Sequence, residues 1–162
     1  MPTRVLAVLT TALVALFAVT ACGGGGGAST EDFAKEFKPI NTGLQTLGDE
    51  IGKTLTSASS RSDAQIASAF SGYAAQLQTL QTKLDDTTPP DDLKRDVDTL
   101  SMAMAQTAKD MLAISKAAKE GDPTKVREAT VAFLSDSKAL RTARVTLTKA
   151  TGLATAQTTT AP

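Results

Sequence analysis

The amino-acid sequence predicts an all-α protein, an up-down-up-down antiparallel four-helix bundle. Apolar residues recur at steps of three and four along four segments, which is the spacing of one helix face. Residues that start or stop helices separate these segments, and the connections are short, about two to seven residues, which makes consecutive helices antiparallel. No segment shows a convincing alternation of apolar and polar residues, the pattern of a half-buried strand.

The first 22 residues have the pattern of an export signal. Arg4 precedes an apolar run from Val5 to Val19, which is shorter than the roughly 20 residues that a transmembrane helix needs. The run leads into Val19-Thr20-Ala21-Cys22. This motif resembles the lipobox of bacterial lipoproteins, in which a branched aliphatic residue and two small residues precede a cysteine.

The lipobox resemblance implies that residues 1–21 are removed and that Cys22 is acylated and becomes the mature N-terminus. The protein would then be held by lipid on the extracytoplasmic face of the cell membrane, and two or more acyl chains suffice for stable anchoring. An uncleaved anchor helix and an ordinary secretory signal are the alternatives. We expect the rest of residues 22–28, which is rich in glycine, to behave as a flexible linker.

The first predicted helix starts at Ser29 or Thr30, where a capping residue is followed by acidic residues that suit the helix dipole. Its apolar stripe consists of Phe33, Phe37, Ile40, Leu44, Leu47, Ile51 and Leu55. The second predicted helix covers about residues 62–84. Its stripe consists of Ile66, Phe70, Tyr73, Leu77, Leu80 and Leu84.

The third predicted helix follows Pro89-Pro90 and holds Asp91 and Asp92 in its first turn, where the helix dipole favours acids. We expect Gly121 to end it in a left-handed conformation. Its stripe consists of Leu93, Val97, Leu100, Met104, Thr107, Met111 and Ile114.

The fourth predicted helix starts at Asp122-Pro123 and ends at Gly152. Its stripe is the weakest of the four, and it consists of Val126, Ala129 or Thr130, Phe133, Leu140 and Leu147. The bundle domain is therefore expected to span residues 29–152. The uncharged segment 153–162 has no helical period and is expected to be a disordered tail.

The first helix contains Pro39, Gly43, Gly48 and Gly52, which weaken a helix interior by about 3 kcal/mol for proline and about 1 kcal/mol for each glycine. Close packing of a neighbouring helix, with a kink at the proline, is one explanation. A mobile helix that opens a pocket between the helices is the other. The candidate walls of that pocket are Phe33, Phe37 and Tyr73.

A basic cluster in the fourth helix is the main candidate surface. Lys138, Arg141 and Arg144 recur every three residues and suit anionic lipid headgroups or envelope polymers. The alternative is a solvated face, or one whose charges pair with the acidic first helix. An acidic run from Asp85 to Asp92 does not match an EF-hand loop, and capping explains it better than a cation site.

Composition excludes several kinds of site. The chain has no histidine, one cysteine and a formal net charge of zero, which disfavours most catalytic triads, transition-metal sites and nucleic-acid binding. Thioether binding of Cu(I) by Met102, Met104 and Met111 is disfavoured too, because no histidine or cysteine joins them and core filling explains them. We expect no enzyme activity, no metal and no cofactor other than the covalent lipid on Cys22.

In overall organisation the chain resembles the small helical lipoproteins of high-GC Gram-positive bacteria. The lipobox, the Pro-Pro pair before an aspartate-rich helix start and the Gly-Asp-Pro hinge carry this resemblance. We therefore expect a membrane-anchored, non-catalytic module that binds an unidentified envelope protein or polymer. The alternative is a small carrier of apolar ligands or lipids with a pocket between its helices. Because the net charge of the whole chain is low, nucleic acid is not among the expected partners.

Overall fold

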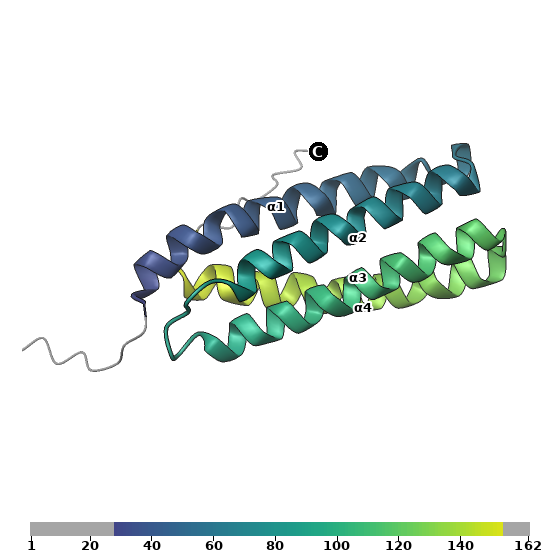
Figure 1. The fold of residues 1–162 in the computed structure, drawn as a ribbon. Helices are drawn as coiled ribbons and strands as arrows, with labels where there is room; N and C mark the ends of the chain where they lie inside the picture. The colour runs from purple at the N-terminus through teal and green to yellow at the C-terminus, as the bar shows by residue number, and fades with distance from the viewer. Residues whose placement is uncertain (1–27, 154–162) are drawn as a thin grey trace, which may run out of the picture.

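The structure is a computed structural model, and it describes residues 28–153. Four long helices lie alongside one another (Figure 1), and a short 3-10 helix, η1 (Ala58–Ser60), follows the first of them. The described residues contain no strand. The prediction of an all-α four-helix bundle is confirmed at this level. The long helices are α1 (Thr30–Thr56), α2 (Asp63–Asp85), α3 (Lys94–Glu120) and α4 (Pro123–Ala150).

The predicted signal peptide (1–21), Cys22 and most of the glycine-rich linker lie outside the described residues. Residues 154–162 of the predicted tail lie outside them as well. Leu153, the first residue of that tail, is described, and its side chain packs against the hydrophobic core.

Helix boundaries follow the capping residues in three of the four helices. Ser29 and Ser62 cap α1 and α2, and Ser62 forms a capping box with Gln65. Asp122 caps α4, with Pro123 in its first turn. Gly121 has a φ of 66°, the left-handed conformation that commonly ends a helix and that glycine adopts without strain.

The predicted start of the third helix is wrong. Asp91 and Asp92 lie in a turn that precedes α3, and the helix begins at Lys94. The N–H of Leu93 donates to the Pro90 carbonyl at 3.0 Å and closes that turn. The Leu93 side chain is buried in the core, as its place in the predicted stripe requires.

The core is formed by the predicted stripes, and α3 contributes most to it. Alanines are buried on α2 and α3, where they allow the two helices to approach closely. Helix α1 makes fewer close backbone approaches and meets the core through large side chains such as Phe33, Phe37 and Leu44. Helix α3 therefore packs as closely on α4 as on α2, and α1 packs on α2 at a longer distance.

Contacts between α2 and α3 place the end of each helix beside the start of the other. Ser115 Oγ, late in α3, donates to the Ala67 carbonyl, early in α2, at 2.7 Å. Ser101 Oγ donates to Asp85 Oδ1 at 2.7 Å at the other end of the same pair. These contacts are compatible with the predicted up-down arrangement.

The glycines of α1 have different surroundings from those expected. A Cβ on Gly43 would lie 2.7 Å from Leu80 Cδ2, so this glycine does allow α2 to approach. A Cβ on Gly48 or Gly52 would meet no atom within 4 Å, and both residues are exposed. Close helix packing therefore explains Gly43, and it is wrong for Gly48 and Gly52.

Candidate functional site

The three basic residues of the predicted patch do not share one environment. Lys138 and Arg141 are exposed, and in the part of the chain that is described neither forms an ion pair. Arg144 is half-buried, and its Nη1 donates to Asn41 Oδ1 on α1 at 3.0 Å. Burial, together with the charge of Arg141, lowers the pKa of Arg144. Two of the three side chains therefore face solvent, and the third belongs to a helix interface.

Asn41 on α1 forms polar contacts with α4. Besides the Arg144 contact, its Oδ1 lies 3.3 Å from Thr148 Oγ1, which also lies 2.7 Å from the Arg144 carbonyl oxygen. Asn41 and Thr148 are both buried. Between residues 28 and 153, no ion pair joins α1 to α4. Of the alternatives for the basic cluster, pairing with the acidic first helix is not seen among these residues, and a neutral amide meets the Arg144 guanidinium instead.

A second row of residues on α4 lies beside its buried face, on the side turned towards solvent. We call this row the outer stripe, and its positions follow steps of four and three, so they share one side of the helix. At 1.5 Å per residue it is about 27 Å long. The outer stripe consists of Arg127, Val131, Leu134, Lys138, Arg141 and Val145.

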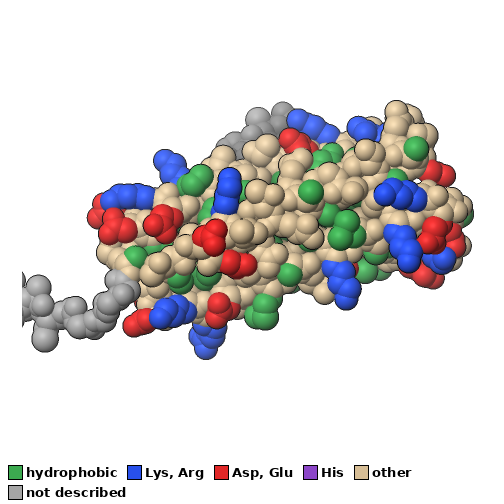
Figure 2. All heavy atoms as spheres, in the orientation of Figure 1, with side chains coloured by type: hydrophobic (Ala, Val, Ile, Leu, Met, Phe, Trp, Pro, Cys, Tyr) green, Lys and Arg blue, Asp and Glu red, His purple; other side chains and the backbone are tan. Residues whose placement is uncertain are grey.

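Five of the six outer-stripe residues are exposed, and they include both apolar and basic side chains, whereas Val145 is half-buried. Val131 is 63% exposed and Leu134 is 51% exposed, although both are large apolar residues. Three of its six residues are basic and none is acidic. On the face that Figure 2 shows, acidic and basic side chains instead lie close together at both ends of the bundle. The sequence signal for this row is its three-four spacing.

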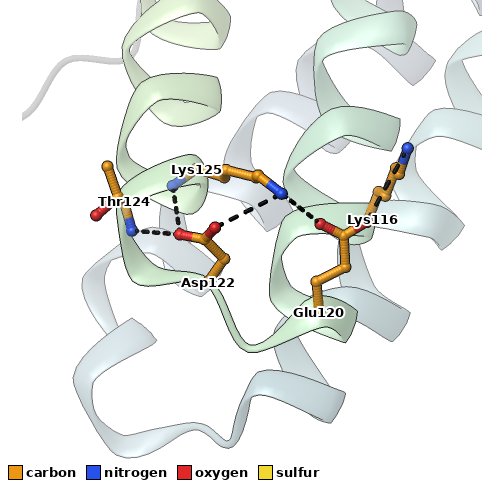
Figure 3. Close-up of polar contacts among 5 residues, drawn as sticks. All are labelled: Lys116, Glu120, Asp122, Thr124 and Lys125. Carbon is orange, nitrogen blue, oxygen red and sulfur yellow. Dashed lines mark hydrogen bonds and ion pairs between the residues drawn. The ribbon is translucent and has the colours of Figure 1, made fainter.

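The turn between α3 and α4 contains a second group of charges, and these are paired with one another (Figure 3). Lys125 Nζ lies 3.0 Å from Glu120 Oε2 and 3.6 Å from Asp122 Oδ2. Asp122 Oδ1 accepts from the backbone N–H groups of Thr124 and Lys125, and these bonds help to lower the pKa of Asp122. This cluster caps the helix, and its charges are already compensated.

The three residues predicted to line a pocket are not brought together. Phe33 and Phe37 stack with their ring centroids 5.9 Å apart, and both side chains are fully buried. Tyr73 lies beside Thr54, with 2.6 Å between the two hydroxyl oxygens. Thr54 is 17 residues after Phe37 on α1, which is about 25 Å along the helix. The aromatic side chains are therefore parts of a packed core at different levels of the bundle.

Surface grooves occur elsewhere. One, of about 350 Å³, lies between α1 and α2 and is lined by Pro39, Ile40 and Leu80 together with charged side chains. Another, of about 320 Å³, lies between α3 and α4 near the paired charges of their turn. Neither groove is lined by Phe33, Phe37 or Tyr73. Both grooves are open to solvent, so neither is an enclosed pocket of the kind expected for an apolar ligand.

The methionines and the acidic run carry no clustered site. Met104 and Met111 are buried in the core, whereas Met102 is 66% exposed, so core filling is wrong for that residue alone. Asp91 forms an ion pair with Lys94 at 2.7 Å, which lowers the pKa of Asp91. Across residues 28–153, no group of three or more histidine, cysteine, aspartate or glutamate side chains is arranged to hold a metal ion.

A carboxyl pair between α3 and α4 was not predicted. Asp110 is only 7% exposed, its Oδ1 accepts from Gln106 Nε2 at 3.1 Å, and its buried Oδ2 has no partner among the described residues. Burial raises the pKa of Asp110, and the neighbouring Asp136 carboxyl raises it further. The only sequence signal was the position of Asp110 beside Thr107 and Met111 in the core stripe. Asp110 Oδ2 is shielded from solvent, whereas Asp136 is half-buried.

Cys22, the predicted acylation site, lies outside the described residues. Within the described range, none of the helices has both the length and the apolar character needed to cross a membrane. No protein-family model, no curated protein and no solved structure matches this chain. The outer stripe and the packed core are therefore the observations on which a functional proposal rests.

Proposed function

We propose that the chain is a lipid-anchored, extracytoplasmic, non-catalytic module that binds a component of the cell envelope through the outer stripe of α4. The lipobox-like Val19-Thr20-Ala21-Cys22 supports the anchor. The observation that carries the binding role is the exposure of Val131 and Leu134 on a helix face that also presents unpaired cations. Large apolar side chains in solvent are common singly, but a row of them with charges of one sign is typical of an interaction surface.

The arrangement proposed for the domain is the up-down-up-down antiparallel bundle. Short connections and the contacts of Ser115 with Ala67 and of Ser101 with Asp85 support it. In this arrangement α4 has one buried face and one face left for a partner. The packed aromatic core favours a binding surface over an internal carrier pocket, since Phe33 and Phe37 are fully buried against each other.

Site-specific photo-crosslinking in intact cells tests the binding role. A photoreactive residue at Leu134 should give a discrete adduct, because this side chain lies on the proposed contact face. The matched control is a photoreactive residue at Gly48, which is exposed on α1 and has no atom near its Cβ position. An adduct from Leu134 alone supports the proposal. Unlinked monomer from both positions contradicts it.

A further inference from the structure

The outer stripe combines apolar and cationic side chains, and few partners can bind both kinds. Along one side of α4 the order is Arg127, Val131, Leu134, then Lys138, Arg141 and Val145. Exposed valine and leucine gain free energy only when they leave water, whereas lysine and arginine lose it if their charges are buried without partners. A suitable partner therefore accepts apolar side chains and holds negative charge at the same depth.

A membrane surface with anionic headgroups has this structure. Helices that lie in the interface bury their apolar side chains at the boundary between headgroups and acyl chains. Long cationic side chains extend to the phosphate level while their methylene stems stay in the apolar layer. Each lysine or arginine near an anionic surface adds to the attraction. Lys138 and Arg141 flank the apolar pair Val131 and Leu134 on the side of the C-terminus, in keeping with this geometry.

A second copy of the chain is a poorer partner. Pairing two outer stripes would bring six cations onto one interface, three from each chain, without an acidic residue from either stripe. Like charges across an interface disfavour association. Charge complementarity thus favours an anionic surface over self-association.

The position of α4 relative to the chain start agrees with a membrane partner. Asn41 contacts Arg144 and Thr148, so the half of α4 that carries Lys138 and Arg141 lies beside the first half of α1. Ser29, which caps α1, is seven residues after the proposed anchor at Cys22. Lys138 and Arg141 therefore lie in the half of α4 that packs beside the anchored half of α1, whereas Arg127 lies towards the opposite end of the bundle.

We propose that the outer stripe of α4 binds the anionic lipid headgroups of the membrane that carries the protein, so that the bundle lies along the membrane surface. This inference rests on the proposed function, since the anchor supplies the proximity that a modest surface needs. The paired charges of Glu120, Asp122 and Lys125 remain at the far turn and do not contribute.

Vesicle co-sedimentation tests the inference. The probe is the mature chain, residues 22–162, with Cys22→Ala, so that no acyl chain contributes to binding. The chain should bind vesicles of phosphatidylglycerol and phosphatidylcholine and leave vesicles of phosphatidylcholine alone in solution. Binding should weaken between about 0.05 and 0.5 M salt, because ions screen the headgroup attraction.

Two pairs of charge-reversal substitutions distinguish the contribution of the outer stripe to binding from that of the overall net charge. Lys138→Glu with Arg141→Glu should weaken binding by about 10- to 100-fold. Lys38→Glu with Lys53→Glu changes the charge equally at exposed α1 positions and should weaken it far less. Val131→Ser with Leu134→Ser should also reduce binding, and circular dichroism of each variant verifies that the helices remain.

Two results would overturn the inference. One is the absence of binding to phosphatidylglycerol vesicles, and the other is an equal loss in both charge-reversal pairs. If vesicle binding is absent while Leu134 still crosslinks to an envelope protein, the inference fails and the proposed function stands. If Cys22 carries no lipid in cells, the anchored function fails whatever the vesicles show.

Discussion

Asp110 on α3 and Asp136 on α4 bring two carboxyl groups together across the interface between these helices. Burial and the second carboxyl raise the pKa of Asp110, so the folded state holds this proton to a higher pH than the unfolded chain does. The folded state then binds more protons than the unfolded state. The free energy of unfolding therefore falls as the pH rises from about 3.9 through the raised pKa.

We expect Asp110→Asn to stabilise the protein at pH 7. The neutral amide keeps an acceptor for Gln106 and adds a donor for Asp136, and it removes a buried charge. The gain in the free energy of unfolding should be about 1–3 kcal/mol. It should shrink as the pH is lowered to about 4, because protonation removes the charge of the wild-type carboxyl. Urea unfolding at both pH values measures it.

Asp98→Asn is the control for this prediction, because Asp98 is an exposed aspartate on the same helix and forms no ion pair within the described residues. It should change stability little at either pH. A lower stability of Asp110→Asn than of the wild type at pH 7 would contradict the carboxyl repulsion.

Asn41→Ala should destabilise the bundle by about 1–3 kcal/mol, because Arg144 and Thr148 lose an acceptor in a buried position. A double-mutant cycle with Arg144→Ala should give a coupling energy between the two positions. Thr42→Ala, at the next residue on the exposed side of α1, serves as the control. Additive effects of the two substitutions would argue against the interhelix contact.

Gly48→Ala should raise the free energy of unfolding by about 0.5–1 kcal/mol. Its Cβ position is open, and alanine restricts the unfolded chain more than glycine does. Gly43→Ala should gain less, because Leu80 must move to admit the new methyl group. Thermal unfolding of the two variants compares them, and a larger gain at Gly43 would show that α1 and α2 lie farther apart.

The packed core predicts no response to apolar ligands. A thermal-shift screen with fatty acids, phospholipids and small apolar metabolites should leave the midpoint of unfolding unchanged, because Phe33 and Phe37 fill the space that a ligand would need. Phe37→Ala should cost about 3–5 kcal/mol. A reproducible rise in the midpoint with one ligand class would favour the carrier alternative.

Cys22→Ala should abolish membrane retention in cells. The wild-type protein should enter the detergent phase on phase separation, since two acyl chains anchor it, and the variant should stay in the aqueous phase. Partition of the variant like the wild type would exclude anchoring through this cysteine.

Local signals in the sequence determined the helices. The three-four spacing of apolar residues marked the buried faces of α1, α2 and α3, since a helix repeats every 3.6 residues whatever it packs against. Gly121, Asp122 and Pro123 marked the turn before α4 because a left-handed residue and a capping carboxylate act within one turn. The start of α3 was placed a few residues too early, because the residues after the prolines form a hydrogen-bonded turn before the helix.

Only the tertiary structure decided which side chains meet. Sequence spacing put Arg144 with Lys138 and Arg141, but the approach of α1 turned Arg144 towards Asn41. The sequence analysis also grouped Phe33, Phe37 and Tyr73 as the walls of one pocket, although these residues lie at different levels of the core. The meeting of Asp110 with Asp136 depends on the register between α3 and α4. Spacing fixes the side of a helix on which a residue lies, whereas the neighbouring helix and its register decide what that residue contacts.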